Sequence, residues 1–239
     1  MKKTLSLFEV CGAETLGRVS AVLGCMSIAE LAAFVLRGIL RDAGSFGDAV
    51  SDSFIPYVFA LGYIGMIWAL AWGCGDNRGA VYTLRRLRSS ERSAFLVRAA
   101  YCIICFAVFM LLQVFLVFVM AFLYRHCGYF KAGSEFLFVS IRAEGFLYAL
   151  IPLTEAVPGI VNAVCVMASG TAAAYMAVLH RDGNGPIVSY AVPAAVIVLY
   201  LLRSLFMGFW AMFGALVILW GICLWAALVY SGDGMWREQ

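Results

Sequence analysis

Residues 95–123 read FLVRAAYCIICFAVFMLLQVFLVFVMAFL, an apolar run in which Arg98 is the only charged residue. A helix rises about 1.5 Å per residue, so this run would form a helix roughly 43 Å long. That length exceeds the ~30 Å hydrocarbon core of a bilayer. The sequence therefore predicts a transmembrane helix that tilts, or that projects beyond the bilayer on its basic side.

The composition of the whole chain also indicates a membrane protein. Of its 239 residues, 64% are hydrophobic and 13% are charged, and the mean hydropathy is +0.93. Soluble domains carry roughly 25% charged residues. The chain has too few polar side chains to cover the surface of a soluble fold. We therefore expect it to lie in the bilayer. The small net charge of +3 gives no reason to expect a nucleic-acid partner.

Apolar runs near the roughly 20 residues that a transmembrane helix needs occur six times. They are residues 18–40, 53–73, 95–123, 158–179, 187–206 and 209–230. The shortest break between them is Met207-Gly208. The predicted fold class is all-α: a polytopic bundle of six transmembrane helices that forms a single transmembrane domain over residues 1–239.

Two further segments are amphipathic. Residues 1–17 lack the pattern of a signal peptide and predict an interfacial helix with Leu5, Phe8 and Cys11 on one side. Residues 124–157 mix apolar and charged residues, with prolines near the bilayer. They predict an interfacial or re-entrant helix on the outer side, buried against protein wherever its backbone is not helical.

Lysine and arginine residues set the expected orientation. With a cytoplasmic N-terminus, eleven of them lie inside and six outside, so the positive-inside rule places both termini in the cytoplasm. It also places there the basic segment 76–98, DNRGAVYTLRRLRSSERSAFLVR, whose six arginines face only two acidic residues.

The first part of this basic segment has a helical pattern. Val81, Leu84 and Leu87 are spaced three apart on one stripe. The arginines that flank the stripe are Arg85, Arg86 and Arg88. Ser90 has the chemistry of a helix N-cap, and Glu91 complements the dipole of the helix that follows. Topology and anionic lipid alone explain the arginines, whereas the apolar stripe predicts docking onto headgroups or into a protein groove.

The sequence shows no catalytic or metal-binding motif. It lacks the phosphate-binding loop G-x-x-x-x-G-K-[ST] and the zinc motif H-E-x-x-H. Cys102 and Cys105 form a C-x-x-C in an apolar run, where packing is the better explanation. Ser169 and His180 lie roughly 16 Å apart along one predicted helix, too far for a hydrolase pair. Small residues at 168–174 instead predict close helix packing, and we expect no enzymatic activity.

Placing a polar side chain within a membrane span costs free energy, so such residues indicate a function. Those that we consider for a substrate pathway are Glu30, Gln113, Glu155, Asn162 and Arg203. Two interpretations of Glu30 stay open: it lines the pathway, paired across it with Arg203, or it forms a satisfied hydrogen bond between helices. Arg37 shares a face with Glu30, but it is explained as well by snorkelling to the headgroups.

The run TLRRLRSSERSAFLVRAAY, residues 83–101, resembles the segment between the second and third spans of type-2 ATP-binding-cassette (ABC) transporter permeases. The residues that match the family pattern are Thr83, Leu84, Leu87, Ser90, Glu91 and Arg92. In that family the segment, here residues 76–94, forms a cytoplasmic coupling helix. The family also has six spans, cytoplasmic termini, an N-terminal interfacial helix and a fourth span rich in small residues. It departs from this chain in carrying re-entrant helices between the fifth and sixth spans.

This resemblance implies a permease subunit of an ABC exporter in the bacterial cytoplasmic membrane. Two permeases, identical or related, would pair above two separately encoded ATPase subunits. ATP and Mg²⁺ would bind to those subunits, so this chain itself is expected to bind no cofactor. The apolar stripe would fill a groove on the ATPase, and its flanking arginines would contact an acidic rim or lipid.

Two alternatives stay open. One is a gradient-driven transporter that works through Glu30, for which transport would depend on proton motive force without an ATPase. The other is a non-transporting sensor or assembly factor that docks onto lipid or protein through the basic helix. An ATPase encoded beside this chain would favour the exporter.

Overall fold

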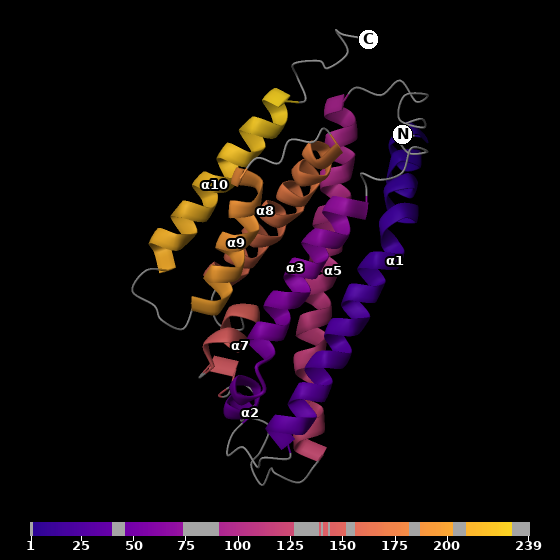
Figure 1. Ribbon diagram of the computed structural model, residues 1–239. Helices are drawn as coiled ribbons and strands as arrows, with labels where there is room; N and C mark the ends of the chain where they lie inside the picture. Colours follow the sequence, from indigo (N-terminus) through magenta and orange to yellow (C-terminus); the bar gives the residue numbers. More distant parts are fainter. Residues whose placement is uncertain are drawn as a thin grey trace.

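The computed structural model describes residues 2–39, 46–73, 91–126, 139, 141–142, 144–151, 156–181, 187–202 and 209–230. The secondary structure within these ranges is helical (Figure 1). The elements are α1 (Lys2–Ala33), the π-helix η1 (Phe34–Ile39), α2 (Phe46–Asp52), α3 (Ile55–Gly73), α5 (Glu91–His126), α7 (Gly145–Leu150), α8 (Ala156–Arg181), α9 (Ile187–Leu202) and α10 (Phe209–Tyr230). The predicted all-α class is confirmed, and a helix covers most or all of each of the six apolar runs.

Some helices of this bundle have the length and composition of membrane spans. Within the described ranges, three helical stretches are long and apolar enough to cross a bilayer: Ser6–Arg37, Arg92–His126 and Gly159–Ala177. The helices α2 and α3 meet at an angle of 53° and make a fourth span if the bent pair counts as one. Phe213–Val229 is a shorter apolar helix.

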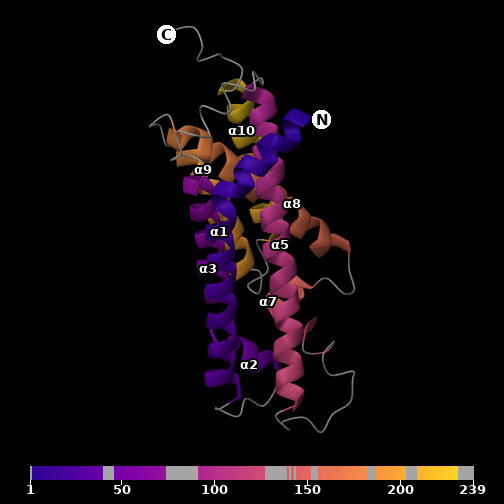
Figure 2. The same cartoon turned by 90° about the vertical axis from the view of Figure 1, so that its right-hand side faces the viewer.

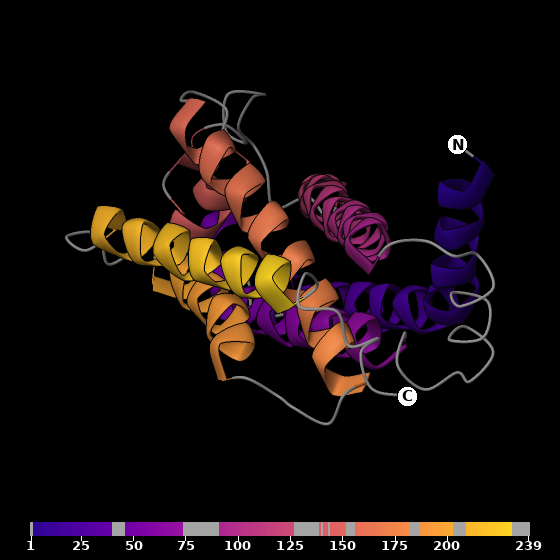
Figure 3. The same ribbon diagram turned by 90° about the horizontal axis from the view of Figure 1, so that it is seen from above.

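The long helices pack side by side around α5 and α8. The helix α5 lies along α8 and α1, α3 lies along α1 and α8, and α10 lies along α9 and α8. As a result, α1 and α10 form opposite flanks of the bundle (Figures 1 and 3). The start of α1, the start of α5 and the end of α10 lie at one end of the bundle, whereas α2 and the end of α5 lie at the other (Figures 1 and 2).

The segment expected as a separate interfacial helix, residues 1–17, belongs to α1. Helical structure runs without a break from Lys2 through the apolar run, because no proline interrupts it. The first turns nevertheless lean away from the rest of α1 (Figure 2). Here Phe8 packs edge-on against Tyr101 of α5, with ring centroids 5.2 Å apart, and Thr15 Oγ1 shares a 2.7 Å hydrogen bond with the Tyr101 hydroxyl. This part of α1 is therefore held against the start of α5.

The helix α5 is 36 residues long, or about 54 Å at 1.5 Å per residue. Its length confirms the prediction of a helix longer than a bilayer core. Within the described residues it runs from Glu91 past Leu123 to His126. The first three residues of the expected outer segment 124–157 therefore continue this helix.

Later in that outer segment lies the short helix α7. Its residues Phe146, Leu147, Ala149 and Leu150 are buried, and it packs on α8 and α9. Six residues bury mainly one face, so this helix depends on its neighbours for stability. The rest of the segment between α5 and α7 lies almost entirely outside the described residues.

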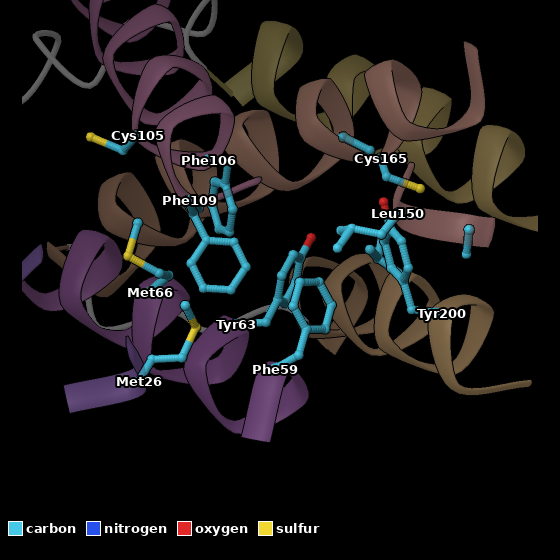
Figure 4. Packing of buried hydrophobic residues seen from close by; sticks show 14 of the residues in the cluster. Met26, Phe59, Tyr63, Met66, Cys105, Phe106, Phe109, Leu150, Cys165 and Tyr200 are labelled. Carbon is cyan, nitrogen blue, oxygen red and sulfur yellow. The ribbon is translucent and has the colours of Figure 1, made fainter. Parts of the chain in front are cut away.

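The interior is rich in aromatic rings contributed by α3, α5 and α9 (Figure 4). Phe59 of α3 lies 5.3 Å, centroid to centroid, from both Phe109 of α5 and Tyr200 of α9. Tyr63, one turn further along α3, lies 5.1 Å from Phe106. Aromatic pairs at these separations contribute about 0.5–1.5 kcal/mol each beyond the burial of their surface.

Candidate functional site

The residues singled out from the sequence fall into two groups. Glu30, Gln113 and Asn162 lie within the described helices, and Glu91 is the first residue of α5. The other predicted site residues lie outside the described residues: Val81, Thr83, Leu84, Arg85, Arg86, Leu87, Arg88, Ser90, Glu155 and Arg203. Residues 76–90 of the predicted coupling segment lie outside them as well, whereas its residues 91–94 belong to α5.

Glu30 belongs to the buried stripe of α1, which faces α3 and α5. The buried residues of this stripe recur mostly at intervals of four: Leu7, Cys11, Thr15, Val19, Met26, Glu30 and Phe34. Residues four apart lie on one face of a helix, so the carboxyl group enters the same seam as its apolar neighbours. The Glu30 side chain is fully buried.

Gln113 meets Glu30 from α5. It lies on the buried stripe of that helix, between Phe109 and Leu116. The Gln113 amide Nε2 donates a hydrogen bond of 2.9 Å to Glu30 Oε2. Glu30 therefore makes a hydrogen bond between helices, as one of its two interpretations expects, and its pathway role with Arg203 stays a prediction because Arg203 lies outside the described residues. The bond joins residues 83 positions apart.

This pair is only half satisfied. Glu30 Oε1 and Gln113 Oε1 are both buried, and neither has a hydrogen-bond partner in the described part of the chain. A buried acceptor without a donor costs about 1–3 kcal/mol. The two orphaned oxygens belong to side chains that already touch, so one additional donor between them would remove both costs.

Arg37 does not balance the charge of Glu30 in this arrangement. Its guanidinium lies over the ring of Phe54, with the carbon 4.3 Å from the ring centroid. The backbone changes from α- to π-helix at Phe34, and this change re-aims the residues that follow. Phe54 forms the joint between α2 and α3 and has a left-handed φ of 56°. Arg37 therefore ties the end of the first helix to that strained joint.

Asn162 of α8 makes a different kind of junction. Its Nδ2 donates to the carbonyl oxygens of Ala149 and Leu150, at 2.9 and 3.3 Å. Its Oδ1 accepts a 2.8 Å hydrogen bond from the Tyr200 hydroxyl. The last carbonyls of a helix have no partner within that helix, so Asn162 caps α7 and links it to α8 and α9. A pathway role for Asn162 stays a prediction.

Several polar contacts between helices were not anticipated from the sequence. The Tyr63 hydroxyl is hydrogen-bonded to Ser169 Oγ of α8, and Trp220 Nε1 of α10 donates to Thr171 Oγ1 at 2.9 Å. Hydroxyl and indole groups inside apolar runs are the only sequence signal for such contacts. Their partners become known only when the helices are packed.

Comparison of the chain with protein-family models, with curated proteins and with solved structures finds no match in any of the three. The features above define a class: a helical membrane protein with a buried, half-satisfied carboxyl–amide pair between two of its longest helices.

Proposed function

We propose that this chain is a permease subunit of an ATP-driven ABC exporter of the bacterial cytoplasmic membrane. The proposal extends the membrane-spanning helices to six spans, with both termini in the cytoplasm. It rests on the resemblance of residues 83–101 to the coupling segment of type-2 permeases. One observation carries it further: α5 begins at Glu91, inside that motif, and continues as a single helix to His126.

A helix of this length is a suitable lever. In the proposed mechanism, residues 76–90 dock onto an ATPase, and movement of that partner pushes on the N-terminal end of α5. The helix would pass the movement to its two main neighbours, α1 and α8. It touches α1 through the Thr15–Tyr101 and Glu30–Gln113 hydrogen bonds.

The arrangement of the helix ends supports the proposed orientation. The start of α1, the start of α5 and the end of α10 share one end of the bundle (Figures 1 and 2). A six-span chain with both termini inside would place the beginning of its third span on that same side. The basic segment would then face the cytoplasm, where the ATPase resides.

The proposed partners follow from the same resemblance. Val81, Leu84 and Leu87 would fill an ATPase groove, ATP and Mg²⁺ would bind in that ATPase, and a second permease copy or a related permease would complete the transporter. Exposed charge pairs contribute only about 0–1 kcal/mol. Most of the docking affinity is therefore expected from the apolar stripe and not from the arginines.

The test is the double variant Leu84→Asp and Leu87→Asp, co-expressed with the ATPase subunit that the proposal assigns to this permease. We expect co-purification of the ATPase to be lost while the variant still inserts in the membrane. Tyr82→Asp is the matched control, because residue 82 lies off the stripe, and it should retain the ATPase. Undiminished co-purification of the double variant would refute the docking role.

A further inference from the structure

The starting observation is a pair of orphaned oxygens in the seam between α1 and α5. Glu30 Oε1 and Gln113 Oε1 are both acceptors, both are buried, and both lack a donor among the described residues. Their side chains are already joined at the other oxygen by the 2.9 Å bond from Gln113 Nε2 to Glu30 Oε2. A primary amide and a carboxylic acid complement each other in two hydrogen bonds, but an amide and a carboxylate share only one.

We propose that Glu30 and Gln113 form a proton-binding site. Glu30 takes one proton from water at Oε1, and the new O–H donates to Gln113 Oε1. No other bond forms or breaks, and the proton returns to water when the site empties. The occupied site is a neutral ring of two hydrogen bonds that satisfies both orphaned oxygens.

The surroundings favour the neutral form. The facing helix α3 contains no Asp, Glu, Lys or Arg between Ile55 and Gly73, and α5 contains none between Arg98 and Arg125. In η1, the guanidinium of Arg37 is engaged with Phe54. An isolated carboxylate in such surroundings is costly to bury without a cationic partner.

Three tyrosines on the facing helices have other contacts. The hydroxyl of Tyr63 on α3 bonds Ser169, and that of Tyr101 on α5 bonds Thr15. The ring of Tyr124 packs against Phe34 and Phe46. The printed partner of Glu30 is the neutral Gln113 amide, so the charge of an ionised carboxyl would have no cationic partner among the described residues.

The consequence is a contact between α1 and α5 that depends on proton occupancy. With the proton bound, the seam holds a complete hydrogen-bonded pair. With the proton released, it holds a buried charge that draws water into the seam. This inference does not depend on ATPase docking, because it concerns a contact within this chain.

The experiment uses infrared spectroscopy on the purified full chain in lipid nanodiscs, at neutral pH and with ¹³C-labelled glutamate. We expect a carboxylic-acid C=O band that shifts with the label, is lost in Glu30→Gln and persists in Glu9→Gln, an exposed position on the same helix. In Gln113→Leu the band should change frequency, because its amide partner is gone.

The unmodified chain gives an independent result, since its labelled band requires no variant to fold. Absence of that band at neutral pH would overturn the proposal. So would a band that has the same intensity in Glu30→Gln as in the unmodified chain. If the carboxylate is ionised and added Na⁺, compared with choline, raises the unfolding temperature of the chain but not of Glu30→Gln, the oxygens hold a metal cation and the proton site is refuted.

Discussion

Gly170 of α8 lies directly against Ile103 of α5, so closely that a Cβ on Gly170 would stand 2.6 Å from the backbone nitrogen of Ile103. No side chain fits at that distance without moving a helix. The neighbouring small residues Ala168, Ala172 and Ala173 are buried as well. The predicted small-residue packing face is therefore confirmed, and it sets the separation between α8 and the helix proposed as the lever.

Enlarging this contact should destabilise the bundle. Gly170→Ala is expected to lower stability by about 1–3 kcal/mol, because overpacking displaces backbone. The measurement is thermal unfolding of the purified protein in detergent, followed by circular dichroism. Gly24→Ala is the matched control, since a Cβ there has no atom within 4 Å. An equal loss in both variants would contradict the packing argument.

The Glu30–Gln113 pair should respond unequally to its variants. Gln113→Leu removes the one donor that a buried carboxyl has among the described residues and should cost about 1–3 kcal/mol. Glu30→Gln should cost much less, because two amides can still pair. Unfolding temperatures of both variants, measured at one pH, test this order.

The double variant Glu30→Leu and Gln113→Leu completes that comparison. Replacing both partners by apolar groups leaves no orphaned oxygen, so it should be more stable than Gln113→Leu alone. Equal unfolding temperatures for the double variant and Gln113→Leu would show that the hydrogen bond does not determine stability here.

Asn162 should hold α7 in place. In Asn162→Leu the carbonyls of Ala149 and Leu150 lose the bonds from Asn162 Nδ2, so amide hydrogen exchange in α7 should accelerate more than in α8. Tyr200→Phe removes only the bond to Asn162 Oδ1 and should leave the α7 rates closer to those of the parent. Unchanged exchange in Asn162→Leu would argue against its capping role.

Glu144, which precedes α7, predicts a pH dependence. Burial raises the pKa of Glu144, and the nearby charge of Asp48 on α2 raises this pKa further. The folded state then holds its proton more tightly than the unfolded state, so stability is lost as pH rises from the ordinary glutamate pKa through the raised one. Glu144→Gln should match the parent at acid pH and unfold at a higher temperature near neutrality.

The control for Glu144 is Asp48→Asn. It removes the charge that raises the Glu144 pKa further, so it should reproduce part of the increase in unfolding temperature near neutrality. Unfolding temperatures across the acid-to-neutral range give the comparison. A difference between Glu144→Gln and the parent that does not vary with pH would exclude titration of Glu144 as its source.

Much of the helix layout could be predicted because it depends on local properties. Apolar runs bounded by glycine, proline and charges form helices wherever the backbone must satisfy its own hydrogen bonds in lipid. Within the described residues, α3 reaches Gly73 and α10 reaches Tyr230, so both helices cover their predicted runs as far as the last residue. The boundary expected after residue 17 does not exist, because nothing in the chain interrupts α1 there.

From the sequence, the candidate site could be predicted only as a set of polar residues that are energetically unfavourable within apolar helices. The sequence by itself determined that Glu30 and Gln113 are buried polar groups in apolar helices, since hydropathy and periodicity are local. Only the tertiary structure decided that they meet, that Arg37 lies instead over Phe54, and that two of their oxygens have no donor among the described residues. The reason is physical: which faces of two helices touch depends on the packing of the whole bundle, here including the close contact of Gly170 with Ile103.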